Sequence, residues 1–218
     1  MILFGGEVSE PVTVNETWAW DGQDWAQLET KGVQIRSGAA LVSDAGRDAP
    51  VLIGGSWGNV TFYADQWEWD GDRWRVIPGS RPPPVAHAAA AYDPSRSELV
   101  MFGGTVHGPG GPGTVGATVG DTWLEQGGKW TKASPASGPT ARYDSVAVFD
   151  PELGQVVLFG GAACPALDAG FWSWDGQNWT DASGPVEPGA RFAASAVYDS
   201  ARHVVVLFGG SNEQACFS

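Results

Sequence analysis

Positive charge is scarce in this chain of 218 residues. Lys and Arg together number 12 against 25 Asp and Glu, which gives a formal net charge of −13. A surface of that charge repels phosphate backbones, and no cluster of Lys or Arg along the sequence opposes the repulsion. We therefore expect no nucleic-acid partner.

Long hydrophobic runs are missing too, although 43% of the residues are hydrophobic. No apolar stretch approaches the roughly eighteen residues that a membrane-spanning helix needs, and Met1 leads into a strand pattern without a basic leader. We therefore expect no membrane span. The acidic composition, rich in Trp, Gly and Thr and poor in Lys, favours an extracellular or cell-envelope location.

Cysteine is limited to two residues, Cys164 and Cys216. Both follow Gly-Gly pairs, so in a repeat protein they would lie on equivalent loops of adjacent copies. A disulfide there is geometrically conceivable, but two free thiols explain the pair equally well. No metal-ligand spacing involves them, and we predict neither a metal nor another cofactor.

Helical periodicity is absent, and in its place the chain has a repeat of about fifty residues. Five hydrophobic runs end in Gly-Gly at intervals of 49, 49, 57 and 49 residues. Four pairs of Trp, each seven residues apart, follow the same rhythm. The glycine pairs begin at Gly5, Gly54, Gly103, Gly160 and Gly209, and the Trp pairs are 18/25, 67/74, 123/130 and 172/179.

Each repeat reads as two antiparallel hairpins. In SVAVFDPELGQVVLFGG two alternating apolar segments flank a turn-rich DPELG. The second hairpin has the form WxWDGxxW, where Asp21-Gly22, Asp70-Gly71 and Asp175-Gly176 favour a two-residue type I′ turn. The third copy has Gly127-Gly128 instead. Four short strands per copy cannot bury both faces alone, which favours copies stacked around an axis.

These motifs resemble the Kelch repeat. Four apolar residues before Gly-Gly, followed by two aromatics at fixed spacing, are that family's signature, and the match covers essentially the whole chain. Bacterial Kelch proteins resemble the form seen here, with an Arg opening the first strand, a YD or FD turn, FGG and WxWDGxxW. The resemblance implies an all-β fold, a Kelch-type β-propeller of four-stranded antiparallel blades, here with about four and a half repeats.

The chain is expected to form one domain, residues 1-218, or a segment of one. It begins at the second strand of a copy and stops just past another second strand, which gives seventeen strands and favours a segment of a larger propeller. Both ends would then expose unpaired strand edges and permit self-association. The repeat units are approximately 1-30, 36-78, 85-133, 142-182 and 191-210.

The twelve Trp residues permit two interpretations. Indole faces bind sugar rings, but the recurrence of the paired Trp at one place in each copy favours packing between blades. Trp20, Trp69 and Trp174 have Glu125 as their counterpart, so we expect that position to be partly exposed. Trp57 occurs in no other copy and is our candidate for an aromatic contact to a ligand.

The start of each inner strand is the second candidate site. In Kelch modules this corner lines one mouth of the central channel, where Arg and small polar residues contact acidic peptides. The alternative is that each Arg bridges to a group on the next blade, and Val85 breaks the pattern of arginines. By resemblance the corner would hold Arg36 with Ser37, His87, Arg142 with Tyr143, and Arg191 with Phe192.

A glycine-rich stretch from Thr105 to Asp121 explains the one longer interval. Insertions in repeat proteins map to one face, often the binding face. A neutral flexible loop explains the stretch as well. No Lys-Ser/Thr follows it at a strand-to-helix junction, so it does not match a phosphate-binding loop.

Enzyme interpretations receive little support. Some Kelch propellers are copper oxidases resembling galactose oxidase, but His87, His107 and His203 fall at different places in their copies. The Asp residues of the WDG motifs serve turns. We therefore predict a non-catalytic scaffold that binds protein or peptide partners through its loops and the Arg-bearing mouth. The alternatives are a carbohydrate-binding or carbohydrate-active, oxidase-like propeller completed by residues outside this segment, and an architectural spacer without a ligand.

Overall fold

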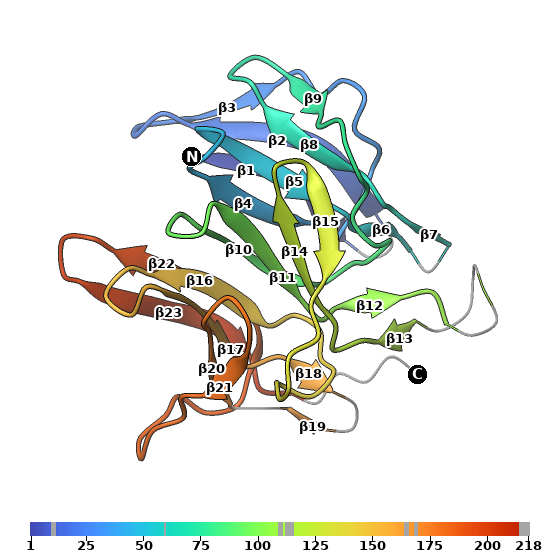
Figure 1. Cartoon of the computed structure of the whole chain (residues 1–218). Coiled ribbons are helices and arrows are strands. Elements are labelled where there is room, and N and C mark those ends of the chain that lie inside the picture. The colour runs from blue at the N-terminus through green and yellow to red at the C-terminus, as the bar shows by residue number, and fades with distance from the viewer. Residues whose placement is uncertain are drawn as a thin grey trace.

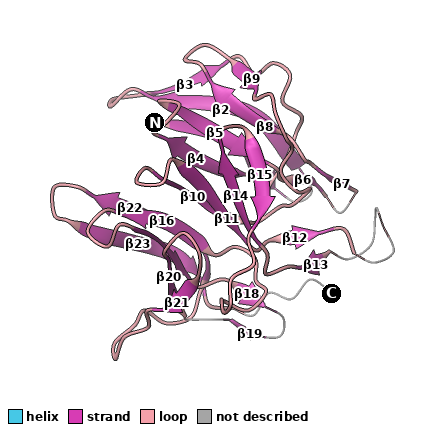
Figure 2. Cartoon of the chain, in the orientation of Figure 1, coloured by secondary structure: helices cyan, strands magenta, loops and turns pink. Residues whose placement is uncertain are grey.

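The computed structural model describes residues 1–9, 12–58, 60–108, 111, 116–163, 166–167 and 170–213. Strands and loops make up all of this part, which contains no helix and so no helix that could span a membrane (Figures 1 and 2). The strands form five main antiparallel sheets and three two-stranded ribbons. The expectation of an all-β chain built from four-stranded antiparallel sheets is confirmed.

The main sheets contain three, four, four, four and two strands in chain order, as the repeat predicts. The first sheet is β1 (Ile2–Ser9), β2 (Val12–Trp20) and β3 (Trp25–Leu28). The second is β4 (Ala40–Asp44), β5 (Ala49–Ile53), β8 (Gln66–Trp69) and β9 (Trp74–Val76). The third is β10 (Ala89–Asp93), β11 (Glu98–Phe102), β14 (Thr122–Gln126) and β15 (Lys129–Lys132). The fourth is β16 (Val146–Asp150), β17 (Gln155–Phe159), β20 (Phe171–Trp174) and β21 (Trp179–Asp181), and the fifth is β22 (Phe192–Asp199) and β23 (Val204–Ser211).

The ribbons were not expected from the sequence. Each lies between the second and third strands of its sheet, and a β-bridge joins its first strand to the segment just before that sheet's innermost strand. All three therefore lie on one side of the series of sheets (Figure 1). They are β6 (Ser56–Trp57) with β7 (Thr61–Phe62), β12 (Thr105–Val106) with β13 (Ala117–Thr118), and β18 (Ala162–Ala163) with β19 (Ala166–Leu167).

The WDG turns differ from the prediction. Trp20 pairs with Trp25, so the first of these loops has four residues, and within it only Gly22 has a positive φ. Asp21 Oδ1 accepts hydrogen bonds from the amides of Gln23 and Asp24, which stabilises this wider turn. The two-residue turn with two positive φ angles occurs in the third sheet, at Gly127 and Gly128. The type I′ prediction was therefore wrong for the WDG copies.

The double glycines serve the contacts between neighbouring sheets. Gly54 and Gly55 have φ angles of 60° and 91°, which a residue with a side chain rarely adopts. The Gly55 amide donates to the Val85 carbonyl of the next sheet over 2.8 Å, and a Cβ on Gly54 would lie 2.4 Å from the same oxygen. Equivalent bonds run from Gly6, Gly104 and Gly161 to the carbonyls of Arg36, Arg142 and Arg191.

The core lies between the faces of successive sheets, where the later Trp of three of the four pairs is inserted. The later Trp of the first pair, Trp25, is 45% exposed instead. Trp74, Trp130 and Trp179 are buried against the preceding sheet, as the packing interpretation requires. Trp69, Trp174 and Glu125 are buried as well, so the expected partial exposure at that position was wrong there. These three side chains are enclosed because a neighbouring sheet covers them.

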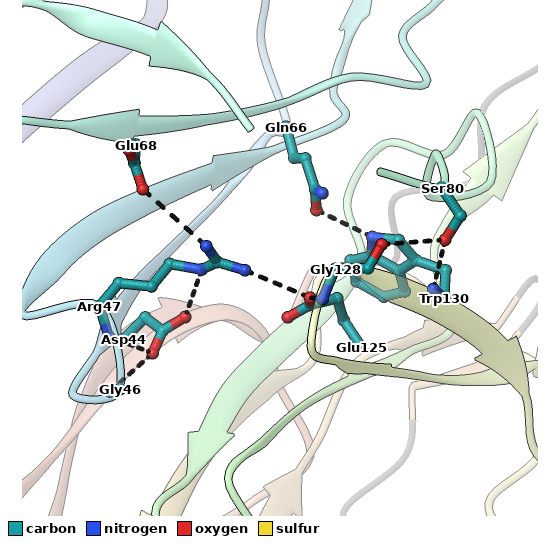
Figure 3. Close-up of polar contacts among 9 residues, drawn as sticks. All are labelled: Asp44, Gly46, Arg47, Gln66, Glu68, Ser80, Glu125, Gly128 and Trp130. Carbon is teal, nitrogen blue, oxygen red and sulfur yellow. Dashed lines mark hydrogen bonds and ion pairs between the residues drawn. The ribbon is translucent and has the colours of Figure 1, made fainter. Parts of the chain in front are cut away.

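A polar contact replaces the missing Trp in the third sheet (Figure 3). Arg47, in the β4–β5 turn, lies 3.0 Å from Asp44 Oδ2 and 3.2 Å from Glu125 Oε1 on the next sheet. Close by, Trp130 Nε1 donates to Gln66 Oε1 over 2.8 Å. The Arg47–Glu125 and Trp130–Gln66 bonds link the second and third sheets, and the bond from Arg47 gives the buried Glu125 carboxylate a partner.

The series of sheets is not closed. β4, β10, β16 and β22 lie next to one another in chain order, so the sheets fan out from a shared side. In the described part of the chain no sheet covers the outer face of either the first or the last sheet. Propeller-like sheets are present, but they do not complete a ring.

Candidate functional site

The starts of the inner strands form a continuous row, which we call the mouth. Its members are equivalent residues of four copies, Gly38, His87, Asp144 and Ala193, with φ angles of 62°, 58°, 52° and 53°. The His87 amide donates to the Gly38 carbonyl over 2.6 Å, Asp144 to His87 over 2.9 Å, and Ala193 to Asp144 over 2.9 Å. Left-handed conformations are uncommon outside glycine. Here they allow each sheet to bond to the next.

His87 and Asp144 are the only two members of the mouth with ionisable side chains. His87 Nδ1 lies 2.8 Å from Asp144 Oδ1, and both side chains are about a quarter exposed, at 27% and 22%. Burial by itself lowers the pKa of His87. The hydrogen bond to Asp144 and the charges of Asp144 and Glu7 outweigh burial, so the pKa lies above its usual value of 6.5. The geometry favours a protonated imidazole at the mouth.

Gly38 supports the imidazole from the other side. A Cβ at this position would lie 2.7 Å from His87 Nε2, so only glycine leaves room for the ring in this place. Tyr143 contacts the ring edge-on, with 6.4 Å between ring centroids. The His87 side chain is thus held between a glycine of the second sheet and two residues of the fourth.

Arg36 lies inside its own sheet rather than on the surface. Only 1% of the residue is exposed. Its Nη1 donates to the Gly54 carbonyl over 2.8 Å, its guanidinium pairs with both oxygens of Asp65, and its Cζ lies 4.0 Å from the centroid of the Tyr63 ring. This arrangement satisfies a buried cation.

The pKa of Asp65, the partner of Arg36, is shifted by this contact. Burial by itself raises the pKa of this carboxyl, but hydrogen bonds from Arg36 and Trp67 and the charge of Arg36 bring it below its usual value of 3.8. The pair therefore remains ionised at neutral pH. Its geometry is that of a structural ion pair that fixes the Gly54 corner.

The other two arginines repeat part of this pattern. Arg142 is 1% exposed and donates to the Gly160 carbonyl over 3.2 Å, while Arg191 is partly exposed and donates to the Gly209 carbonyl over 3.0 Å. Each arginine side chain thus contacts the double glycine of its own copy. The carbonyls of the same three arginines accept hydrogen bonds from the preceding sheet. The suggested side-chain bridge to the next blade was wrong for Arg36, whose guanidinium pairs with Asp65 of its own copy, and it stays a prediction for Arg142 and Arg191.

The remaining predicted residues divide between the mouth and the packing around it. Ser37 and Tyr143 form backbone bridges to Ser56 and Ala162 of the ribbons, and Tyr143 is buried. Phe192 pairs with Ser211 in the last sheet and is partly exposed. Of the predicted set, only His87 is one of the four residues of the mouth; Arg191, which directly precedes β22, also has an ionisable side chain that is partly exposed. Sequence reasoning missed Asp144, the partner of His87, although the repeat places both at equivalent positions.

Trp57 lies on the ribbon β6–β7 and is 50% exposed. Val60, at the turn of the same ribbon, is 55% exposed, and its amide lies 3.4 Å from the Trp57 carbonyl. Two large apolar side chains are thus presented to solvent at one projecting turn, which we call the ribbon tip. Sequence reasoning missed Val60, since nothing in the pattern distinguished it from loop valines.

The predicted long loop supplies the second ribbon. Its strands β12 and β13 lie beside β6–β7, where the His107 ring packs edge-on against Phe62 with 4.7 Å between centroids. The first two ribbons therefore share one surface. Residues 109–110 and 112–115 of the loop, and both cysteines, lie outside the described residues, so the disulfide prediction stays a prediction.

Among the described residues no group of three or more His, Cys, Asp or Glu is arranged to hold a metal ion. Compared with protein-family models and with curated proteins, the chain matches none.

Proposed function

We propose that the chain is a run of Kelch-type propeller blades and acts as a non-catalytic binding scaffold for a protein or peptide partner, with the ribbon tip as its main contact. Support for the family comes from the repeated double glycine, the WxWDGxxW hairpin and the four-stranded sheets that they build. The proposal does not rest on Arg36 and Arg142, because both are buried in packing roles.

The ribbon tip is the observation that carries this function. The recurring Trp74, Trp130 and Trp179 are buried between sheets, whereas Trp57 is half exposed beside the exposed Val60. An aromatic side chain that neither the core nor a neighbouring sheet uses is a typical anchor of a protein interface. A ribbon bonded to the sheet presents it at little cost in conformational entropy.

The net charge of −13 indicates which charge the partner's surface should have. Like charges across an interface oppose association, so the partner surface is expected to be apolar at its centre and basic or neutral around it. This differs from the acidic peptide that the buried arginines suggested. Recognition would then combine insertion of the ribbon tip with favourable long-range attraction.

The test is a selection of peptides from a random displayed library against the full chain. Peptides recovered against the wild type should bind the Trp57→Ala variant about thirtyfold more weakly, the effect of losing a central aromatic anchor worth about 2 kcal/mol. Val76→Ala serves as the control, because Val76 is comparably exposed on an outer strand. Equal binding to wild type and Trp57→Ala would contradict the proposal. Trp57-dependent binding to a glycan array without any peptide would establish the carbohydrate alternative.

A further inference from the structure

One aromatic contact recurs between successive sheets. The ring centroids of Phe4 and Trp74 lie 5.5 Å apart in an edge-on arrangement, and those of Phe102 and Trp179 have the same separation. Ile53 takes the place of the phenylalanine in the core that contains Trp130. The strand that leads into the double glycine, which is β1, β5 or β11, therefore supplies an apolar side chain, and the outer hairpin of the next sheet supplies an indole.

Hydrogen bonds repeat with the rings. Trp74 Nε1 donates to Thr17 Oγ1 over 2.9 Å, and Trp179 Nε1 donates to Thr122 Oγ1 over 2.8 Å. Both bonds are buried and cross from one sheet to the sheet before it. The contact is thus directional, with one surface contributing the phenylalanine and the opposite surface contributing the tryptophan.

The last sheet presents the phenylalanine surface without a cover. Phe208, which is equivalent to Phe4 and Phe102, is 81% exposed. Val197 and Val206 pair across β22 and β23 on the same face and are exposed too. β23 contains no charged residue, so it lacks the charges that protect many exposed strands from pairing.

The first sheet presents the tryptophan surface without a cover. Trp25, which is equivalent to Trp74 and Trp179, is 45% exposed and packs against Trp20 with 5.6 Å between ring centroids. Leu3 lies on the same face, opposite Trp18, and is also exposed. The two end faces of the chain therefore carry the phenylalanine and the tryptophan of its internal contact, while in the described part of the chain the two-stranded last sheet has no strand that corresponds to the threonine-bearing β2 and β14.

We propose that two copies of this chain associate head to tail, with Phe208 of one copy packed against Trp25 of the other. The internal sheets show that such surfaces fit, because the Phe–Trp contact is present twice within the chain. Exposed apolar faces of this kind mark interaction sites. A contact between two different faces is heterologous, so copies can extend into rings or chains rather than stop at a symmetric dimer.

Sedimentation velocity and light scattering over a range of protein concentrations test this proposal. The wild-type mass should rise with concentration, whereas Phe208→Glu and Trp25→Glu should each remain monomeric. An equimolar mixture of the two variants should form a heterodimer and nothing larger, since one variant keeps the Trp25 face and the other keeps the Phe208 face. Leu3→Glu disrupts the same face as Trp25→Glu but keeps the Trp20–Trp25 contact, so it should give the same results as Trp25→Glu.

Circular dichroism and thermal melting establish that each variant is folded. The matched control is Trp57→Glu, a comparably exposed tryptophan on the ribbon tip, which should associate as the wild type does. A wild type that stays monomeric at every concentration would overturn the proposal, as would single variants that still associate or a mixture that stays monomeric. Peptide binding through Trp57 is measured on the Phe208→Glu variant, so the two proposals fail or succeed separately.

Discussion

Arg47 and Glu125 join two sheets through a single charged hydrogen bond. Arg47 Nη2 donates to Glu125 Oε1 over 3.2 Å, and the Gly128 amide donates to the same oxygen over 2.6 Å (Figure 3). Glu125 stands where the other copies have Trp20, Trp69 and Trp174. One buried carboxylate therefore replaces an indole by satisfying an arginine of the preceding sheet and the turn of its own hairpin.

Replacing Glu125 with Ala should lower the free energy of unfolding by about 2 kcal/mol, because the partly buried Gly128 amide and the Arg47 guanidinium lose their shared acceptor. Glu125→Gln should cost less, since an amide oxygen still accepts both bonds. Urea unfolding followed by circular dichroism measures the difference. Glu29→Ala, in an exposed pair with Lys31, should change stability by at most about 0.5 kcal/mol. An equal loss in Glu125→Ala and Glu29→Ala would show that the bond between the sheets contributes nothing.

The Gly38→Ala substitution should be more costly than its backbone angle alone explains. A left-handed alanine costs about 1 kcal/mol, and the clash of its Cβ with the His87 ring should bring the total to about 3 kcal/mol. Gly127→Ala is the matched control, since its φ is 60° and nothing lies within 4 Å of the added Cβ. Thermal or urea unfolding compares the two variants.

The same pair permits a double-mutant cycle. Gly38→Ala combined with His87→Ala should recover the part of the loss that comes from the clash, so the two substitutions should not be additive. Additive losses would indicate that the imidazole moves away from the added methyl group without cost, in which case Gly38 serves the backbone angle alone.

His87 should make stability depend on pH. Since its folded-state pKa is raised above 6.5, its contribution is fully present below pH 6.5 and is lost as the pH rises through the folded-state value. The difference in unfolding free energy between wild type and His87→Gln should therefore shrink from mildly acidic to alkaline pH. Asp144→Asn, which removes the partner, should abolish this dependence. A difference that grows with pH would show that burial, and not Asp144, controls the imidazole.

How much of this could be predicted from the sequence depends on whether a feature is repeated. Every strand of the five sheets was predicted from the Gly-Gly pairs, the Trp pairs and the alternating segments, because each copy must bury the same positions against its neighbours. The partners of single residues could not be predicted this way. Asp144 beside His87, and Arg47 beside Glu125, come from different copies, and which copy supplies a partner depends on how the sheets stack.

The turns and the arginines show a second limit. Asp21-Gly22 resembles a two-residue turn in sequence, but the aspartate side chain bonds to the amides of Gln23 and Asp24 and opens a four-residue loop. In sequence Arg36 resembles a ligand anchor, because an arginine just before a strand has the same neighbours along the chain whether its side chain faces solvent or the Gly54 carbonyl of its own copy. Only the position of Asp65, twenty-nine residues away, settles its burial.

The arginines themselves give the last prediction. Arg36→Met should destabilise the chain by about 3–5 kcal/mol, because Asp65 is left partly buried without its partner. Arg191→Met should cost about 1 kcal/mol, since the partly exposed Arg191 donates to the Gly209 carbonyl and has no ion pair among the described residues. The Arg36 effect should be largest at neutral pH. In the variant, burial still raises the pKa of Asp65 while the opposing bond and charge of Arg36 are gone, so the effect should shrink as the pH falls from neutral through 3.8 and protonation removes the unpaired charge. Urea unfolding at neutral and acid pH measures both variants. Similar small losses at both positions, together with weaker binding of the selected peptides, would show instead that the arginines act at the binding face.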